Sequence, residues 1–430
     1  MDLSYSSVQN AGELTSVDQS ALYEAWREVD LVWRLNFTFS LFFLHSKNVN
    51  RPCVPYFMER LAKQMLITFS ALVVLLIMVS FITAQHPLLG KNPTEQRMEF
   101  VQNSINFQNG KFRNLIEKPG MTEGSNIVVE VYKTFFKSIP NREPSEALPS
   151  VKTKLKALDP QQDALVWFGH SSAFMQLDGK TFLIDPVMSG KASPFPWGTR
   201  AYKGTDIYTV DDLPEIDYLL ISHDHYDHLD YETILKLKDK VKLVVTGLGV
   251  GEHFEHWGYP KNKLIEADWG DKMDFGNGIS IITETAHHDS GRAFAGGQHL
   301  WVSFIIKSSE RKIFYTGDGG YDKHFAEIGK KYGPFDWALM ENGQYDPAWR
   351  SVHCHPDEVA QATEELQARN MIPVHHSKFS LAKHAWYEPI TRISEYSKSR
   401  NYRLATPMIG ELVQLDNDQQ PFKEWWKDVR

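Results

Sequence analysis

One short stretch near the middle of the chain, Ile221–Asp230, constrains the fold and chemistry of the protein more than any other. Its sequence is ISHDHYDHLD, so six consecutive residues include three histidines and two aspartates. It follows an apolar run, Ile216–Ile221, which is broken only by Asp217 and has the length and composition of a buried strand. This density of metal-binding side chains at a strand end predicts a functional site.

The spacing within this stretch indicates a metal centre. Strand alternation points His223 and His225 to the same side, while Asp227 and His228 fall where the chain turns into a helix expected over residues 231–240. Imidazole and carboxylate groups suit zinc or iron, and two adjacent ions can clamp and activate a water. The alternative is a charged loop that caps the following helix.

Four other predicted strands also end on residues that can bind a metal. A lone histidine beside a strand is usually packed or exposed to solvent, so each segment alone is weak evidence. Together with the central stretch, however, they supply enough ligands for a site with two ions. The four segments are Gly169-His170-Ser171-Ser172, Ala286-His287-His288-Asp289, Gly317-Asp318-Gly319-Gly320 and His375-His376-Ser377-Lys378.

Strands and helices alternate from about residue 164 onward. Expected strands lie at 164–168, 173–177, 181–184, 216–221, 241–246, 278–284, 300–307, 312–315, 371–374 and 411–415. Further amphipathic helices are expected at 321–331, 356–369 and 384–400. This order predicts an α/β protein with two packed sheets and helices outside them, a four-layer αββα sandwich over residues 151–430. Residues 86–150 are polar and rich in proline, which indicates an irregular lead-in that wraps this domain.

The segment 64–85 carries no charge and is rich in Leu, Val, Ile and Phe, as in a membrane-spanning helix. Arg60 and Lys63 precede it, which favours a cytoplasmic N-terminus and export of the domain that follows to the periplasmic or extracellular side. Ile82-Thr83-Ala84 loosely matches a signal-peptidase site, so cleavage and secretion remain the alternative. The length of the apolar run favours the uncleaved anchor. The extension before it, residues 1–63, indicates no function.

Charge and cysteine content exclude some classes of protein. The net charge is −8, with 54 acidic and 46 basic residues, which argues against a general nucleic-acid binder. The two cysteines, Cys53 and Cys354, lie far apart in the sequence and make no disulfide framework. We expect Cys354, which stands between His353 and His355, to be a buried thiol rather than a metal ligand.

Taken together, the motifs resemble the metallo-β-lactamase superfamily of binuclear hydrolases. The resemblance covers about residues 140–415 and is closer to the branch that includes N-acylphosphatidylethanolamine-hydrolysing phospholipase D and L-ascorbate-6-phosphate lactonase. One departure is Asp289, where this branch usually carries an aromatic residue in the pocket wall. The segments that carry the resemblance are Trp167-Phe168-Gly169-His170-Ser171, Leu183-Ile184-Asp185-Pro186, Ile216-Asp217-Tyr218, residues 223–230, Gly317-Asp318-Gly319-Gly320-Tyr321 and His353-Cys354-His355-Pro356-Asp357-Glu358.

The resemblance implies two metal ions per chain, which we expect to be zinc, with iron or manganese as alternatives. His287 and His376 adjoin two of the implied ligands, and strand alternation favours a supporting or packing role for both. The implied ligands are His223, His225 and His288 on one ion, Asp227, His228 and His375 on the other, and Asp318 as the bridge.

Catalytic roles follow from the same resemblance. A water shared by the two ions would act as the nucleophile, beside Asp227. Asp224 is expected to steer this water or support a ligand histidine, and His353 to orient the substrate or protonate the leaving group. Three cationic side chains flank the metal loops and can bind a phosphate or serve as ordinary surface charge: Lys191, Arg200 and Arg292.

These features favour a metal-dependent hydrolase, most simply a phosphodiesterase that acts on phospholipids such as N-acyl phosphatidylethanolamine. An enzyme held at the bilayer through residues 64–85 meets lipid at a high effective concentration. A lactonase or another ester hydrolase with the same metal site is the main alternative. A nuclease is disfavoured because the chain is acidic and lacks a basic stripe. A metal-binding scaffold without turnover is the remaining alternative, and the complete ligand set argues against it.

Overall fold

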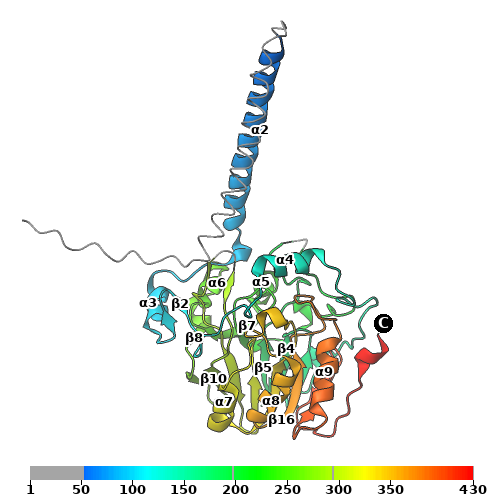
Figure 1. Ribbon diagram of the computed structural model, residues 1–430. Coiled ribbons are helices and arrows are strands. Elements are labelled where there is room, and N and C mark those ends of the chain that lie inside the picture. The colour runs from blue at the N-terminus through cyan, green and yellow to red at the C-terminus, as the bar shows by residue number, and fades with distance from the viewer. Residues whose placement is uncertain (1–52, 196–197, 293–294, 430) are drawn as a thin grey trace, which may run out of the picture. The chain divides into compact units, whose positions relative to one another are not determined.

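The structure is a computed structural model that describes residues 53–195, 198–292 and 295–429 and divides the chain into two units (Figure 1). The described part of the first unit is residues 53–81 of helix α2 (Cys53–Ala84), and the second unit is Ile82–Arg430. Residues 1–52, which hold most of the predicted N-terminal extension, lie outside the described residues.

Helix α2 begins well before the span expected at 64–85. Its stretch Phe57–Met78 has a mean hydropathy of 2.1 and is long and apolar enough to cross a membrane by length and composition. Lys63 forms an ion pair with Glu59, at 2.7 Å and one helical turn earlier, so these charged residues continue the helix. The expected helix start at residue 64 is therefore corrected, while the membrane role stays a prediction.

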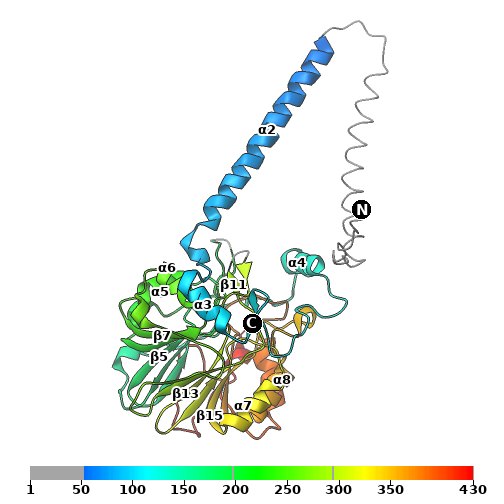
Figure 2. The same cartoon turned by 90° about the vertical axis from the view of Figure 1, so that its left-hand side faces the viewer.

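The second unit is built on two sheets of seven strands each, packed face to face (Figures 1 and 2). In order, the first sheet contains β18 (Leu412–Gln414), β3 (Ala164–Trp167), β4 (Ala173–Leu177), β5 (Lys180–Ile184), β6 (Ile216–Ile221), β7 (Val241–Gly247) and β8 (Leu264–Ala267). The second contains β17 (Arg403–Leu404), β16 (Ala368–Val374), β15 (Phe335–Glu341), β14 (Lys312–Tyr315), β13 (Ser303–Lys307), β10 (Ser280–Glu284) and β9 (Lys272–Asp274).

Helices cover the outer face of each sheet, as Figure 2 shows. Three apolar cores hold the layers together: one between the sheets, one under the helices of the first sheet and one under those of the second. The predicted four-layer αββα sandwich is therefore confirmed. The covering helices are α5 (Tyr231–Leu237) and α6 (Gly251–His256) on the first sheet, and α7 (His324–Tyr332), α8 (Pro356–Glu365) and α9 (Glu388–Ser397) on the second.

Strand β6 shows why the sequence folds in this way. Tyr218 and Leu220 point into the core between the sheets, whereas Leu219 and Ile221 point into the core beneath the helices. Both faces of this parallel strand are buried, so its sequence is a continuous apolar run. The strand therefore ends at a fixed position in the interior and delivers the histidine-rich stretch there.

Several elements differ from the sequence-based expectations. Strand β15 was not predicted, because its apolar centre, Trp337–Met340, is too short to tell from a helical segment. Helix α8 ends at Glu365 instead of residue 369, because β16 begins at Ala368 and extends the expected strand by three residues at its start. Helix α7 begins at His324, after the loop that follows Asp318.

The lead-in is more ordered than predicted. It contains two helices, α3 (Glu95–Asn103) and α4 (Ile127–Phe136), and a short hairpin, β1 (Phe107–Gln108) and β2 (Lys111–Phe112). Phe112 is buried, and its backbone N–H donates to the carbonyl oxygen of Gly297 at 2.7 Å. The expectation of an irregular lead-in is therefore wrong for these residues, which pack against the sandwich as part of the second unit.

Candidate metal centre

The first group of ligands comes from the loops after β6 and β10. His223 Nε2 lies 3.0 Å from His225 Nδ1, which lies 3.3 Å from His288 Nε2. His223 and His288 are buried, and His225 is half-buried at the edge of the group. The ligand atoms of these three residues all lie within 4.8 Å of one another, close enough to bind a single ion.

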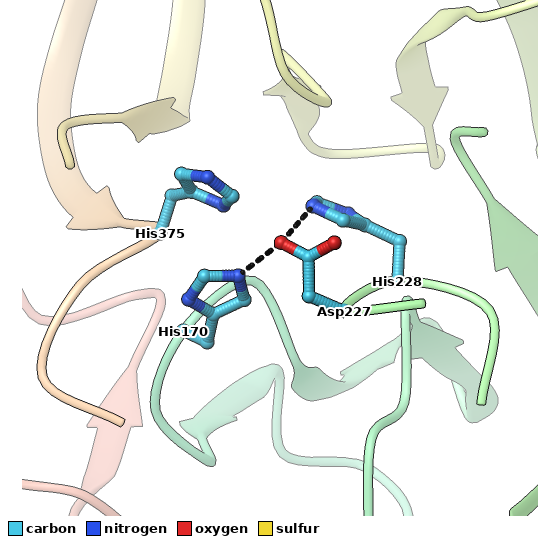
Figure 3. Close-up of side chains that lie close together, drawn as sticks. All are labelled: His170, Asp227, His228 and His375. Atoms are coloured by element: carbon cyan, nitrogen blue, oxygen red, sulfur yellow. Dashed lines mark hydrogen bonds and ion pairs between the residues drawn. The ribbon is translucent and has the colours of Figure 1, made fainter. Parts of the chain in front are cut away.

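The second group lies beside the first and is drawn in Figure 3. Asp227 Oδ2 is 3.6 Å from His228 Nε2 and 2.8 Å from His170 Nε2. His375, from the end of β16, completes a set whose ligand atoms all lie within 4.8 Å of one another. His170, which the sequence only marked as a strand-end residue, thus lies directly against the carboxylate of Asp227.

Asp318 lies between the two groups. Its Oδ2 atom is 3.0 Å from His228 Nε2 and 3.9 Å from His223 Nε2. His228 Nε2 and Asp318 Oδ1 are buried, and within the described residues neither has an aligned hydrogen-bond partner. His228 Nε2 lies close to Asp318 Oδ2, and Asp318 Oδ1 lies 3.1 Å from His375 Nδ1, so these buried atoms crowd together without aligned hydrogen bonds, and a cation would satisfy them. The donor set therefore fits two ions with Asp318 shared between them.

Burial gives most of these histidines the form that metals require. It lowers the pKa of His223, His288 and His375 well below the usual range, so their imidazoles are neutral. For His228, burial also lowers the pKa, but the carboxylates of Asp318 and Asp227 outweigh it and raise the pKa well above the usual range. A cation bound between these carboxylates would take the place of that proton.

Other protein groups fix the orientation of the ligand rings. Asp185, at the end of β5, accepts hydrogen bonds from His228 Nδ1 at 2.8 Å and from the Ser222 backbone N–H at 2.8 Å. Ser171 Oγ lies 2.9 Å from His375 Nδ1, and His288 Nδ1 donates to a backbone carbonyl. Such partners set which ring nitrogen faces the metal. Sequence reasoning placed Asp185 in a segment that carries the resemblance but gave it no role, although its position after a buried strand parallel to β6 was a usable signal.

His353 lies next to both groups. Its ring centroid is 5.3 Å from those of His288 and His375. Its Nδ1 atom hydrogen-bonds to Glu341 Oε1, and the other oxygen of Glu341 accepts the backbone N–H of Gly319 at 2.8 Å. Nδ1 is thus occupied, and Nε2 is the nitrogen that His353 offers to a substrate. Glu341 was missed because it ends the unpredicted strand β15.

Asp224 faces away from the ligands. Its carboxylate lies 3.2 Å from His253 Nε2 and 3.1 Å from His299 Nδ1, and it accepts the backbone N–H of Gly291 at 2.8 Å. The backbone N–H of Lys91 donates to His253 Nδ1 at 2.9 Å, so Nε2 keeps its hydrogen and cannot bind a metal. Asp224 therefore holds the loop, and the part in catalysis expected for it stays a prediction.

The remaining polar candidates have structural partners. Burial lowers the pKa of His376 to about 3, and its ring packs on Trp167. His287 lies 3.5 Å from Asp322, and burial lowers its pKa to about 4. Cys354 is buried, and its Sγ donates to a backbone carbonyl. Cys354 is thus the buried thiol that the sequence predicted, and His287 and His376 belong to none of the groups of described residues that could hold a metal.

The cationic side chains near the metal loops are engaged as well. Lys191 forms an ion pair with Glu232 at 2.7 Å. Arg292 is buried, so the alternative that it is ordinary surface charge is wrong, while phosphate binding stays a prediction. Its terminal N–H groups donate to the carbonyl oxygens of Leu88, Asp224 and Leu229.

A cavity of about 290 Å³ opens over the metal ligands. His225, Asp227 and His353 lie in its wall, and Asp289, the departure from the related branch, lies at its exposed rim. Apolar parts of the wall come from Trp349 and Leu381. The metal ligands are thus reachable by a small substrate.

Comparisons with known proteins identify relatives of this chain. The beta-lactamase superfamily domain matches residues 180–376. N-acyl-phosphatidylethanolamine-hydrolyzing phospholipase D 1 of Caenorhabditis elegans is 30% identical over 340 residues, covering 72% of this chain and 92% of that protein. An uncharacterized protein of Mycobacterium tuberculosis is 30% identical over 331 residues, which cover 76% of this chain and 88% of that protein. Among solved structures, the isothiocyanate hydrolase from Delia radicum gut bacteria is 18% identical, with a TM-score of 0.47. The match covers 58% of this chain and 98% of that chain.

The chain therefore belongs to the metallo-β-lactamase superfamily of metal-dependent hydrolases. Within that superfamily it is related to the N-acyl-phosphatidylethanolamine-hydrolysing phospholipases D.

Proposed function

We propose that this protein is a phosphodiesterase that hydrolyses phospholipids, in the manner of an N-acyl-phosphatidylethanolamine phospholipase D. The observation that carries the proposal is the placement of Asp318 between two groups of ligands beneath an open cavity. The relationship to the worm enzyme over 92% of that enzyme's length supports a lipid substrate. We propose zinc as the metal, because neutral imidazoles and carboxylates are its usual ligands.

The metal ions and the surrounding side chains would have different roles in hydrolysis. Two divalent cations held there would lower the pKa of a shared water and polarise the phosphoryl oxygen of the substrate. Asp227 and Asp318 bring negative charge that offsets the charge of the cations, and Asp185 orients the ring of His228. His353 lies in the cavity wall, and because Glu341 occupies its Nδ1, Nε2 is the nitrogen left to hold a proton for the leaving oxygen.

Glu341 would keep His353 ready for this role. Burial raises the pKa of Glu341 well above the usual range, and burial lowers the pKa of His353. The raised pKa of Glu341 and the lowered pKa of His353 both favour a neutral pair that shares a hydrogen between Glu341 Oε1 and His353 Nδ1. The ring is then fixed in orientation, and a second hydrogen can reside on Nε2, where the departing alkoxide needs it.

Two apolar features support a site of action at a membrane. The second unit begins at Ile82, directly after the apolar stretch of α2, so an anchored α2 would keep the catalytic unit at the bilayer surface. We propose that α2 is such an anchor and that the catalytic unit is exported. Helix α4 also exposes large apolar side chains, as helices that lie in a lipid interface do. They are Val128, Val129, Tyr132 and Phe136, exposed by 72%, 46%, 56% and 75%.

Digestion of a lipid extract by the zinc-loaded full-length protein tests the proposal. Wild type should consume a class of phospholipid and release a phosphatidic acid, as seen by mass spectrometry, while Asp227→Asn should not. His353→Ala should retain both metal ions and lose turnover. Hydrolysis of lactones without any change in lipids would favour the lactonase alternative. Two bound ions without turnover of lipid, lactone or bis(p-nitrophenyl) phosphate would refute catalysis and leave the alternative of a metal-binding scaffold.

A further inference from the structure

The lead-in reaches the metal centre through one side chain. Asn114 follows strand β2, and its amide pairs with the backbone of His288 in both directions. Its Oδ1 atom accepts the N–H of His288 at 3.0 Å, and its Nδ2 group donates to the carbonyl oxygen of His288 at 2.8 Å. Trp301 Nε1 also donates to Oδ1, at 3.1 Å, and thereby holds the amide itself in place.

His288 needs such a partner because it lies outside the sheet. Strand β10 ends at Glu284, so the backbone N–H and carbonyl groups of His288 have no neighbouring strand. Asn114 takes the place of that strand and fixes the peptide groups on both sides of the residue. The ring is fixed separately, because Nδ1 donates to the carbonyl oxygen of Val352 at 3.2 Å. The remaining nitrogen, Nε2, is then aimed at His225 Nδ1.

We propose that Asn114 is a positioning residue of the metal centre. By holding the peptide of His288, it sets the affinity of the group His223, His225 and His288 for its ion. The inference rests on the two-ion site of the proposed function. It extends the centre to a residue outside the segment 180–376 that the superfamily domain matches.

A matched pair of variants separates positioning from simple stabilisation. Asn114→Leu keeps the size of the side chain and removes both hydrogen bonds to His288. Asn106→Leu makes the same change elsewhere in the lead-in, where Asn106 Nδ2 donates to Asp268 Oδ1 at 2.8 Å. Asp268 is not a metal ligand. Both variants should lower the melting temperature of the metal-free, full-length protein in detergent by a few degrees, because each loses partly buried hydrogen bonds.

Zinc affinity should differ between the two. Competition with a chromophoric chelator, together with elemental analysis, should show one of the two ions bound about 10–100-fold more weakly in Asn114→Leu. Asn106→Leu should bind both ions as wild type does. Asn114→Asp, which keeps the acceptor for the His288 N–H but loses the donor, should lie between them.

Wild-type zinc affinity in Asn114→Leu, or an equal loss in both leucine variants, would overturn the inference. Asn114→Asp carries the test if Asn114→Leu does not fold: wild-type affinity in Asn114→Asp would then overturn it. The readout is metal binding, so a failure to hydrolyse lipid would refute the proposed function and leave this inference standing.

Discussion

Replacing Asp185 with asparagine should weaken the metal site from a position that touches no metal. Asp185 is fully buried, and its two oxygens accept four hydrogen bonds. Oδ1 accepts the Ser222 N–H, while Oδ2 accepts from Ser222 Oγ, His228 Nδ1 and Tyr315 Oη. Asparagine has one oxygen and one NH₂ group, so in either orientation at least one donor meets another donor.

The expected magnitude follows from these contacts. A hydrogen bond to a charged group contributes about 1.5–3 kcal/mol, and a buried donor left without an acceptor costs about 1–3 kcal/mol. Losing one bond and weakening the others should lower the free energy of unfolding by about 2–4 kcal/mol. The ring of His228 becomes a weaker and less well-oriented ligand, so zinc affinity at this ion should fall about 10–100-fold, or ~1.4–2.8 kcal/mol.

Urea unfolding of the metal-free protein and chelator competition with zinc measure the two effects. Asp163→Asn is a control for stability alone, because the Asp163 carboxylate accepts the N–H of Asp178 and pairs with Arg311 Nε, both at 2.9 Å, and contacts no ligand histidine that the structure describes. It should lose stability and keep wild-type zinc affinity. If Asp185→Asn binds zinc as tightly as wild type, the orienting role derived for Asp185 is refuted.

Two further predictions concern the membrane and acid stability. Phe136→Ser in α4 should slow hydrolysis of vesicle-borne phospholipid several-fold and leave hydrolysis of a soluble diester unchanged. The control Leu235→Ser, the same kind of change at an exposed apolar residue of α5, should alter neither rate. Equal rates of the two variants on vesicles would contradict contact between α4 and lipid. Burial lowers the pKa of His324 to about 3, whereas in the unfolded chain this imidazole takes up a proton near pH 6.5. The free energy of unfolding therefore decreases as pH falls from about 6.5 to about 3, by at most ~1.4 kcal/mol per pH unit. In urea unfolding of the metal-free protein, His324→Gln should show a shallower loss over this range, and an unchanged slope would count against the buried neutral histidine.

Much of the fold followed from local patterns. The apolar run of β6 is buried on both faces, and the same holds for β7 and β14, so their composition predicted interior strands. Strand β15 was missed because Asp336 interrupts its pattern and only a short apolar centre remains. Helix α4 was missed because the prolines around it suggested an irregular chain. Both errors come from segments too short for periodicity to decide.

The candidate metal ligands, like the strands, could be predicted where a local pattern in the sequence marks them. The covalent spacing of His223, His225, Asp227 and His228 places them within a few residues of one strand end, and so the sequence alone indicated a metal centre. Local geometry allows only one of His287 and His288 to bind a metal easily, since neighbouring residues in an extended chain face opposite ways, and the resemblance to the superfamily selected His288.

Only the tertiary structure decided what surrounds those ligands. Asn114 and His288 are 174 residues apart, and Asp185 and His228 are 43 apart. Such pairs meet because sheets and loops pack in one arrangement, and no periodicity in the sequence records which distant residues will become neighbours. The sequence by itself determined which side chains can bind the metals, whereas packing determined the orientation of each ring and the partner that holds it.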